Sequence, residues 1–187
     1  MGENALVALG SNANSHHGPP RANVEGALDA LHGGRIRVVR ASGFYLTPFF
    51  PAGREPDVVN AVAIVETDLD PSALLAHLHD IESEFDRARG TRWGSRTLDL
   101  DLLAMGQRVL PDAATVERWM AMPLEDQKRL APDGLILPHP RMHERAFVLV
   151  PAAEVAPDWR HPLTGRTIRE MRDALPREDV SAVRPLA

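Results

Sequence analysis

The chain has 187 residues, a length typical of one domain, and 44% of them are hydrophobic while 25% are charged, as in soluble folded proteins. Its 21 basic and 26 acidic residues give a formal net charge of −5, which argues against coating nucleic acid. There are no cysteines, which excludes disulfides, thiolate catalysis and cysteine-ligated metals. The sequence contains neither a basic, apolar leader nor an apolar run near the ~20 residues of a membrane span. We therefore expect one cytoplasmic domain over 1–187, with no nucleic-acid or membrane partner.

The N-terminal quarter alternates between strand and helix patterns. A short β-like run over 4–9 ends in the turn-forming sequence Gly10-Ser11-Asn12. An amphipathic helix follows, because apolar residues recur at helical spacing until two glycines at 33–34 end the pattern. Its apolar positions are Val24, Ala27, Leu28 and Leu31. The apolar character of 35–46 then predicts a second strand.

The next segment predicts a loop, a strand, a helix and a strand in turn. The prolines in 47–56 exclude regular structure there, whereas the valine-rich run over 58–67 predicts a strand buried on both faces. Asp70 suits a helix N-cap and Pro71 the first helical position. The buried stripe of that helix comprises Leu74, Leu78, Ile81 and Phe85. Alternating residues over 97–104 predict a fourth strand.

The order β-α-β-β-α-β is typical of an α/β (α+β) fold with a ferredoxin-like core, in which both helices lie on one face of an antiparallel sheet. The core spans about 4–160, and we interpret the polar stretch 107–134 as an insertion with a short helix around 123–130. A C-terminal extension closes the chain. Its expected parts are an apolar segment over 135–139, a second near 147–150, and a helix over 167–175.

Two carboxylates share one face of the fourth predicted strand. In Leu98-Asp99-Leu100-Asp101-Leu102 the strand period of two sends the leucines to one side and both aspartates to the other. Their Cα atoms are then ~6.6 Å apart, where like charges repel by ~2.5 kcal/mol at an effective dielectric of ~20. A pair of Mg²⁺ ions bridging to nucleotide phosphates would offset this repulsion. The alternative is an exposed strand face with solvated charges.

Arginines gather just before this strand, at Arg87, Arg89, Arg92 and Arg96. Guanidinium groups suit bidentate phosphate contacts, and phosphate binding beside a two-carboxylate metal site favours phosphoryl transfer. Alternatively, Arg87 and Arg89 pair with nearby acidic residues or cap the preceding helix. The acidic residues concerned are Glu82, Glu84 and Asp86.

A histidine is the last candidate group. His139 lies between Pro138 and Pro140, in a stiff turn where its imidazole can donate to a phosphate oxygen. A zinc site with His143 is disfavoured, because the prolines prevent a regular helix from starting before His139.

Several of these motifs together resemble the 6-hydroxymethyl-7,8-dihydropterin pyrophosphokinase family, over about residues 4–160. The resemblance implies transfer of the β,γ-diphosphate of ATP to the pterin hydroxymethyl group with release of AMP, on a ferredoxin-like fold. The motifs are Ala8-Leu9-Gly10-Ser11-Asn12, Phe44-Tyr45-x-Thr47-Pro48, Asn60, Arg92-Trp93-Gly94-x-Arg96-Thr97-Leu98-Asp99-Leu100-Asp101 and Pro138-His139.

The resemblance also implies roles for individual residues. Asp99 and Asp101 would hold two Mg²⁺ ions and, with Arg92 and Arg96, form the catalytic set. The expected ATP contacts are Glu82, Arg87, Arg92, Trp93, Arg96, Leu102, Ile136, His139 and Arg145. The expected pterin contacts are Gly10, Thr47, Pro48, Asn60, Trp93, Asp99 and Phe147, with Phe147 stacking on the ring.

Some positions depart from the family pattern. Val58 stands where many members carry a tyrosine on the other pterin face, Pro140 where an aromatic often follows the histidine, and His79 where a glutamine often lies. The loop between Arg89 and Arg92 is one residue shorter, and 107–134 is longer. We expect weaker pterin stacking unless Phe49 or Phe50 replaces the missing ring.

The expected chemistry is in-line attack of the pterin hydroxyl on the β-phosphorus, with catalysis by positioning and charge stabilisation. Asp99 or Asp101 could accept the proton, although metal ligation lowers their basicity. We expect a monomer with small-molecule partners, and closure of 90–95 and of the insertion over ATP. A nucleotidyl cyclase or polymerase-palm relative is one alternative, and an RNA-binding module is another, although the third strand has no aromatic residue.

Overall fold

The computed structural model describes residues 2–49, 56–85 and 96–187, and within them a six-stranded antiparallel sheet forms the centre. The sheet order is β5-β1-β4-β3-β6, and β2 also pairs with β4. The strands are β1 (Glu3–Ser11), β2 (Ile36–Ala41), β3 (Tyr45–Thr47), β4 (Val58–Thr67), β5 (Asp99–Met105) and β6 (Arg184–Pro185).

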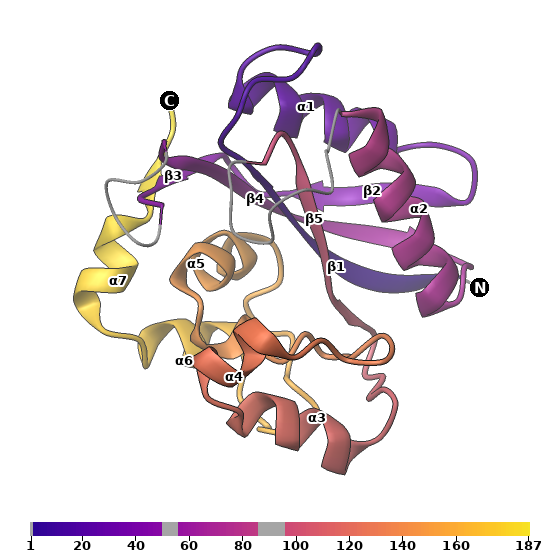
Figure 1. The fold of residues 1–187 in the computed structure, drawn as a ribbon, viewed down its shortest axis with the longest axis vertical. Coiled ribbons are helices and arrows are strands. Elements are labelled where there is room, and N and C mark those ends of the chain that lie inside the picture. Colours follow the sequence, from indigo (N-terminus) through magenta and orange to yellow (C-terminus); the bar gives the residue numbers. More distant parts are fainter. Residues whose placement is uncertain (1, 50–55, 86–95) are drawn as a thin grey trace.

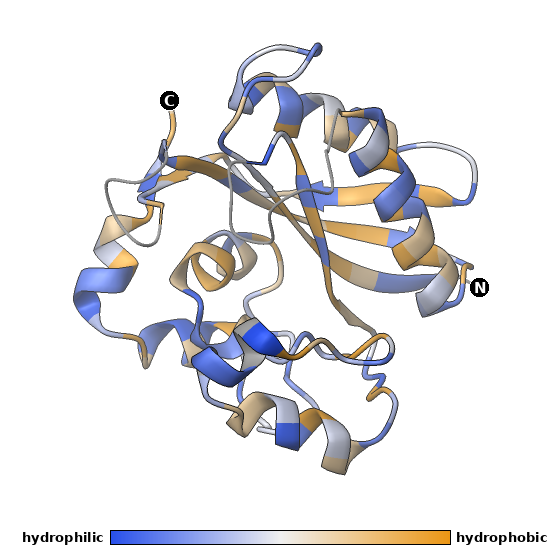
Figure 2. Cartoon of the chain, in the orientation of Figure 1, coloured by the Kyte–Doolittle hydropathy of each residue, from blue (hydrophilic) through white to orange (hydrophobic). Residues whose placement is uncertain are grey.

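Helices cover both faces of this sheet, with α1 and α2 on one side and α5, α6 and α7 on the other (Figure 1). The result is a three-layer molecule whose central strands are apolar (Figure 2). The helices are α1 (Pro20–Leu31), α2 (Pro71–Glu84), α3 (Ala113–Ala121), α4 (Leu124–Arg129), the 3₁₀ turn η1 (Met142–Glu144), α5 (Ala146–Val155), α6 (Ile168–Asp173) and α7 (Arg177–Ala182).

The predicted ferredoxin-like core is confirmed, with one strand divided in two. The four predicted strands lie side by side in the sheet in the order fourth, first, third and second. The predicted strand over 35–46 is realised as β2 and β3, both of which pair with β4. The first part, β2, ends at Ala41, and two residues later the backbone N–H of Gly43 donates to the carboxylate of Glu154 on α5, at 3.0 Å, instead of to a neighbouring strand.

The face under α1 and α2 forms the larger hydrophobic cluster. The predicted stripes are buried there, with Val24, Leu74 and Leu78 each 0% exposed. The side chain of Asp70 caps α2 by accepting from the backbone N–H groups of Ser72 and Ala73, both at 3.0 Å. The expectation that both core helices share one face of the sheet is therefore confirmed.

The opposite face is covered by elements that the sequence only partly revealed. Residues 147–150, predicted as a short apolar segment, belong to α5, whose Val148, Leu149 and Ala152 are buried against the sheet. The predicted helix over 167–175 is α6, which opens with a capping box between Thr167 and Glu170. This second cluster covers one end of the sheet face and leaves the other end to polar residues.

The insertion contains two helices rather than the single one predicted. The short helix around 123–130 is confirmed as α4, but α3 was not anticipated. The side chain of Asp112 caps α3 by accepting from the backbone N–H of Thr115 at 2.9 Å, and the only buried residue of α3 is Val116. A bridge between Leu110 and Leu137 closes the insertion and returns the chain to β5. Among the described residues no helix is both long and apolar enough to cross a membrane.

Candidate active site

The strand register brings the predicted metal and pterin residues into one row across the sheet. Asp99 on β5 lies opposite Gly10 on β1, Gly10 opposite Asn60 on β4, and Asn60 opposite Tyr45 on β3. Directly paired residues point to the same face of an antiparallel sheet. The next residue of this face on β5 is Asp101, and beyond it begin the apolar side chains that α5 covers. The row therefore forms a polar end to an otherwise buried face.

The two aspartates share this face, as predicted. Leu100 and Leu102, which alternate with them, are 2% and 3% exposed in the cluster under α1 and α2. Arg96 forms an ion pair with Asp99, and both side chains are about one third exposed, at 32% and 26%. The protein itself therefore supplies part of the positive charge that the paired carboxylates require.

Arg96 and the start of β5 are held by the loop that follows β1. The backbone N–H of Arg96 donates to Oδ1 of Asn12 at 2.8 Å, and the N–H of Asn12 donates to the carbonyl of Arg96 at 3.0 Å. The fully buried Asn23 donates to the carbonyl oxygens of Thr97 and Ala13, at 3.0 and 2.9 Å. These buried contacts fix the backbone from which Asp99 projects.

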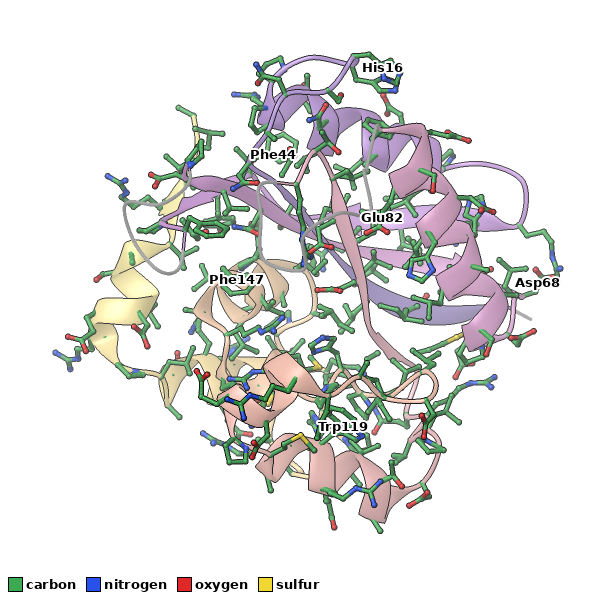
Figure 3. All side chains as sticks on the ribbon, in the orientation of Figure 1. His16, Phe44, Asp68, Glu82, Trp119 and Phe147 are labelled. Atoms are coloured by element: carbon green, nitrogen blue, oxygen red, sulfur yellow. The ribbon has the colours of Figure 1, made fainter. Side chains whose placement is uncertain are left out.

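Glu82 reaches β5 from the other side of the sheet. It is 3% exposed, and its Oε1 accepts the backbone N–H of Leu100 at 2.7 Å. Figure 3 shows Glu82 on α2 and Phe147 on α5, on opposite sides of β5. The predicted ATP contact Leu102 has its side chain in the core on the α2 side, so only its backbone faces the edge of β5.

The segment before η1 runs beside β5 and carries the predicted histidine. The backbone N–H of His139 donates to the carbonyl of Leu103 at 2.7 Å, and the predicted ATP contact Ile136 is buried three residues earlier. Nδ1 of His139 accepts the backbone N–H of Arg141 at 3.2 Å. Because burial lowers the pKa of His139 to about 3, the ring is neutral and its proton sits on Nε2. The site thus contains a neutral N–H donor.

Arg145 lies at the N-terminus of α5, close to the aspartates. Burial lowers its pKa, and the negative charge of Asp101 is the largest opposing effect, which places the guanidinium within electrostatic reach of Asp101. The same guanidinium lies 5.6 Å from the centre of the Phe147 ring. Phe147 is 39% exposed, so part of its ring surface is open to a ligand.

A further arginine, not singled out from the sequence, belongs to this group. The positive charge of Arg141 lowers the pKa of both His139 and Arg145, so it lies near both. Its side chain is only 18% exposed and forms an ion pair with Glu144. The overlooked signal was the spacing of Arg141 two residues after His139 and four before Arg145.

The predicted pterin residues gather at the other end of the row. Nδ2 of Asn60 donates to Oγ1 of Thr47 at 2.7 Å and to the carbonyl of Val58 at 3.2 Å. A Cβ on Gly10 would lie 3.2 Å from Oδ1 of Asn60 and 3.8 Å from the Val58 side chain, so the glycine allows Asn60 to lie close to β1. Pro48, next to Thr47, is exposed. Val58 therefore lies beside Gly10 and Asn60.

Several predicted residues lie outside the described part of the chain. They are Arg87, Arg89, Arg92, Trp93, the loop over 90–95, and Phe50.

The aspartate pair has the donor chemistry that Mg²⁺ prefers. Asp99 and Asp101 offer carboxylate oxygens on a partly exposed face, and Mg²⁺ is commonly bound by one or two carboxylates with waters and phosphate oxygens. Within the described ranges no group of three or more His, Asp or Glu side chains could form an all-protein metal cage. The residues present therefore fit a metal shared with a phosphate ligand.

Comparisons with known proteins agree with this geometry. The model of the family 7,8-dihydro-6-hydroxymethylpterin-pyrophosphokinase (HPPK) matches residues 6–157. A 2-amino-4-hydroxy-6-hydroxymethyldihydropteridine pyrophosphokinase of Pseudomonas aeruginosa is 40% identical, over 96% of each chain. One with the same name from Synechocystis is 38% identical, over 98% of this chain and 80% of the relative.

Solved structures share the fold. Two HPPK-DHPS crystal structures from Plasmodium falciparum superpose with TM-scores of 0.63 and 0.66 at 13% and 14% identity. They cover 91% and 92% of this chain, which spans less than half of theirs, 43% and 45%. Together with the matched family model and the relatives of similar length, this shows that the chain belongs to the 7,8-dihydro-6-hydroxymethylpterin-pyrophosphokinase family.

Proposed function

We propose that this chain transfers the β,γ-diphosphate of ATP to the hydroxymethyl group of 6-hydroxymethyl-7,8-dihydropterin, releasing AMP, as a step of folate biosynthesis. One observation carries the proposal: Asp99 and Asn60 face the same side of the sheet, two strands apart, with Gly10 between them. Two strand spacings amount to ~10 Å. A fused two-ring heterocycle held at Asn60 and Phe147 can extend along this row and present its hydroxymethyl group to the aspartates.

The nucleotide half of the site is formed by cationic groups around the aspartates. Arg96 and Arg145 contact the carboxylates electrostatically, and the neutral His139 offers its Nε2–H. We assign the triphosphate to these three residues together with Arg141, Arg87 and Arg92. Planar guanidinium groups bind phosphate oxygens in pairs, which fixes the orientation of the transferred group.

Two Mg²⁺ ions are the metals we assign to Asp99 and Asp101. When bound, they neutralise the charge on the phosphate oxygens and align the transferred group. Arg96, which pairs with Asp99, would then lie between these carboxylates and the phosphates.

The residues of this chain act mainly by position. Asn60, Thr47 and Phe147 orient the pterin, while His139 and the arginines hold the triphosphate so that the pterin oxygen meets the β-phosphorus in line. His139 and Arg145 are partly buried, and burial lowers the pKa of each, so their contacts to developing negative charge are less screened than at the surface. We propose that the monomer is active.

A product assay tests this function against a nucleotidyl cyclase or polymerase-like reaction. The chain would be incubated with ATP, Mg²⁺ and 6-hydroxymethyl-7,8-dihydropterin, and the products separated by ion exchange. We expect AMP and pterin diphosphate in equal amounts, and neither without pterin. Formation of ADP, or of pyrophosphate with a cyclic or polymeric nucleotide, would contradict the proposal.

A further inference from the structure

Tyr45 ends the polar row across the sheet but has no part in the proposed function. It pairs with Asn60 in the ladder between β3 and β4, so its side chain lies on the face that α5 covers. Its hydroxyl donates to Oε2 of Glu154 on α5 at 3.1 Å. Burial raises the pKa of Tyr45 and the hydrogen bond to Glu154 raises it further, so the phenol keeps its proton and remains a donor at neutral pH. This end of the row is therefore joined to the helix that covers the sheet.

Glu154 receives a second hydrogen bond from the same segment of chain. The backbone N–H of Gly43 donates to the same oxygen, Oε2, at 3.0 Å. The carbonyl of the next residue of α5, Val155, accepts from Nη1 of Arg40 at 3.3 Å. Three hydrogen bonds thus join the C-terminal end of α5 to the end of β2 and the start of β3.

These hydrogen bonds matter because β3 has little support of its own. The strand is three residues long, and in the described part of the chain its neighbour on the outer side is the two-residue strand β6. Short strands near a sheet edge open more readily than long central ones, because few contacts must break. Helix α5, by contrast, is held by side chains buried against the sheet, among them Leu149 and Ala152, both 0% exposed. Glu154 therefore attaches β3 to the more firmly held of the two elements.

Strand β3 carries one proposed pterin contact and supports another. Thr47, its last residue, is 6% exposed, and its Oγ1 accepts from Nδ2 of Asn60 at 2.7 Å. The amide of Asn60 is thus oriented through β3 as well as through its own strand. Phe147, the proposed stacking ring, belongs to α5, seven residues before Glu154. A displacement of β3 from α5 would therefore separate the polar pterin contacts from the ring that stacks on the pterin.

We propose that Glu154 is a positioning residue for the pterin, because its carboxylate holds β3 against α5 and so keeps Thr47 and Asn60 in their binding positions. The inference rests on the proposed function of that site. Glu154 acts through β3 and needs no contact of its own with the pterin. Loss of the link releases β3 and leaves α5 packed on the sheet, with Arg145 at its N-terminus, so the nucleotide half should not respond.

Both side-chain and backbone donors bond to one oxygen of Glu154, which gives a sharp set of variants. Glu154→Ala removes both hydrogen bonds, whereas Glu154→Gln keeps an oxygen that can accept both and loses only the charge. Tyr45→Phe removes one of the two. Asp80→Ala, at an exposed acidic residue of α2 on the opposite face of the sheet, is the matched control.

The effect would be measured by titrating 6-hydroxymethyl-7,8-dihydropterin in the presence of Mg²⁺ and a non-hydrolysable ATP analogue, and by steady-state kinetics. We expect Glu154→Ala to raise the Kd and KM of pterin about fivefold, with the Kd of the ATP analogue unchanged and kcat lowered less than about twofold. Glu154→Gln and Asp80→Ala should bind pterin as the wild type does. Tyr45→Phe should lie between wild type and Glu154→Ala. The double variant should match Glu154→Ala, because the alanine has already removed the acceptor.

Four results would overturn the proposal: wild-type pterin affinity in Glu154→Ala, an equal loss of ATP-analogue affinity, a Glu154→Gln variant as weak as Glu154→Ala, or a double variant weaker than Glu154→Ala. Should Glu154→Ala fail to fold, Tyr45→Phe decides by the same comparison of the two ligands. Failure of the proposed function is a separate outcome, recognised by wild-type chain that forms no AMP from ATP and pterin.

Discussion

The two halves of the site are built in different ways. Most of the pterin half stands on the sheet, where strand register places Gly10 beside Asn60 and Asp99, and only Phe147 comes from α5. The nucleotide half stands on the turn around η1, where position depends on single hydrogen bonds such as that from Arg141 to His139. A ladder of backbone hydrogen bonds tolerates the loss of one side chain, whereas a turn held by a few buried polar contacts does not. We therefore expect substitutions to affect the two substrates separately, except at β5, where the halves meet.

The largest effect should come from the residues that both halves share. Asp99→Asn and Asp101→Asn should each lower kcat by at least about a hundredfold, because each removes a carboxylate that binds metal. Their free energy of unfolding should change by less than about 1 kcal/mol, since the Arg96–Asp99 pair is partly exposed and Asn still accepts a hydrogen bond. Rates and urea melts would be compared, and near-normal kcat in both variants would contradict the metal role.

Histidines in the turns of the molecule should also make its free energy of unfolding depend on pH. Burial lowers the pKa of His161 to about 4, below its ordinary 6.5, so between these values the unfolded chain binds a proton that the folded chain does not. The free energy of unfolding should therefore fall as pH drops from 6.5 towards 4, by at most about 3 kcal/mol from this residue. Urea melts across this range would show it.

Two variants control this experiment. His161→Asn should lose the share that comes from His161 and keep the share of His139, whose pKa burial lowers to about 3, whereas His32→Gln, at an exposed histidine, should keep the whole dependence. Parallel curves for wild type and His161→Asn would exclude His161 as the source.

Gly10→Ala should affect the pterin alone. The new Cβ would lie 3.2 Å from Oδ1 of Asn60 and force that amide to move by a few tenths of an ångström. We expect the Kd of pterin to rise about tenfold while that of an ATP analogue stays constant. Calorimetric titration of each ligand measures both. If the affinities for pterin and for the ATP analogue fell equally, the pterin half would not be independent of the nucleotide half.

Arg141→Ala should have the opposite selectivity. Loss of its guanidinium should weaken binding of an ATP analogue about fivefold and leave pterin binding unchanged. Arg37→Ala, which breaks an exposed ion pair with Glu66 away from the site, is the matched control and should change neither affinity. Wild-type ATP affinity in Arg141→Ala would remove Arg141 from the nucleotide half.

The only substitution expected to tighten binding concerns Val58, whose side chain lies near Gly10. Val58→Tyr adds an aromatic face for the pterin, and we expect tighter pterin binding by up to ~10-fold, from a stacking energy of ~0.5 to 1.5 kcal/mol. Phe49→Ala and Phe50→Ala test whether either phenylalanine already supplies that face. If none of the three variants changes pterin affinity, Val58 does not border the pterin.

The same contrast explains how far the sequence alone could lead. The period of two in 98–102 places both aspartates on one face, and that interpretation is confirmed because strand alternation is local. The pairing of Asn60 with Gly10 follows once the strand order is known. Asp70 as the N-cap of α2 is likewise a local signal, and its hydrogen bonds confirm it.

The nucleotide half and the helices around it could not all be predicted in this way. The hydrogen bonds that orient the rings of His139 and His161 have no periodic signature, because each is made with backbone N–H groups of the turn that follows the ring. The segment that forms α5 is apolar on all sides, so periodicity could not distinguish helix from strand there. Helix α3, in contrast, has a local signal that the interpretation of 107–134 as a polar insertion overlooked, since Val116, Trp119 and Met120 recur at helical spacing after the N-cap Asp112.

The central claim is that one row of the sheet joins the two substrates at Asp99. A crystal structure of the chain with pterin, Mg²⁺ and a non-hydrolysable ATP analogue tests it most directly. We predict the pterin ring over Gly10, between Asn60 and Phe147, and the β-phosphate near Asp99 and Asp101 with His139 and Arg145 on its other side. Pterin bound away from Gly10, or a triphosphate that contacts neither aspartate through a metal, would contradict the claim.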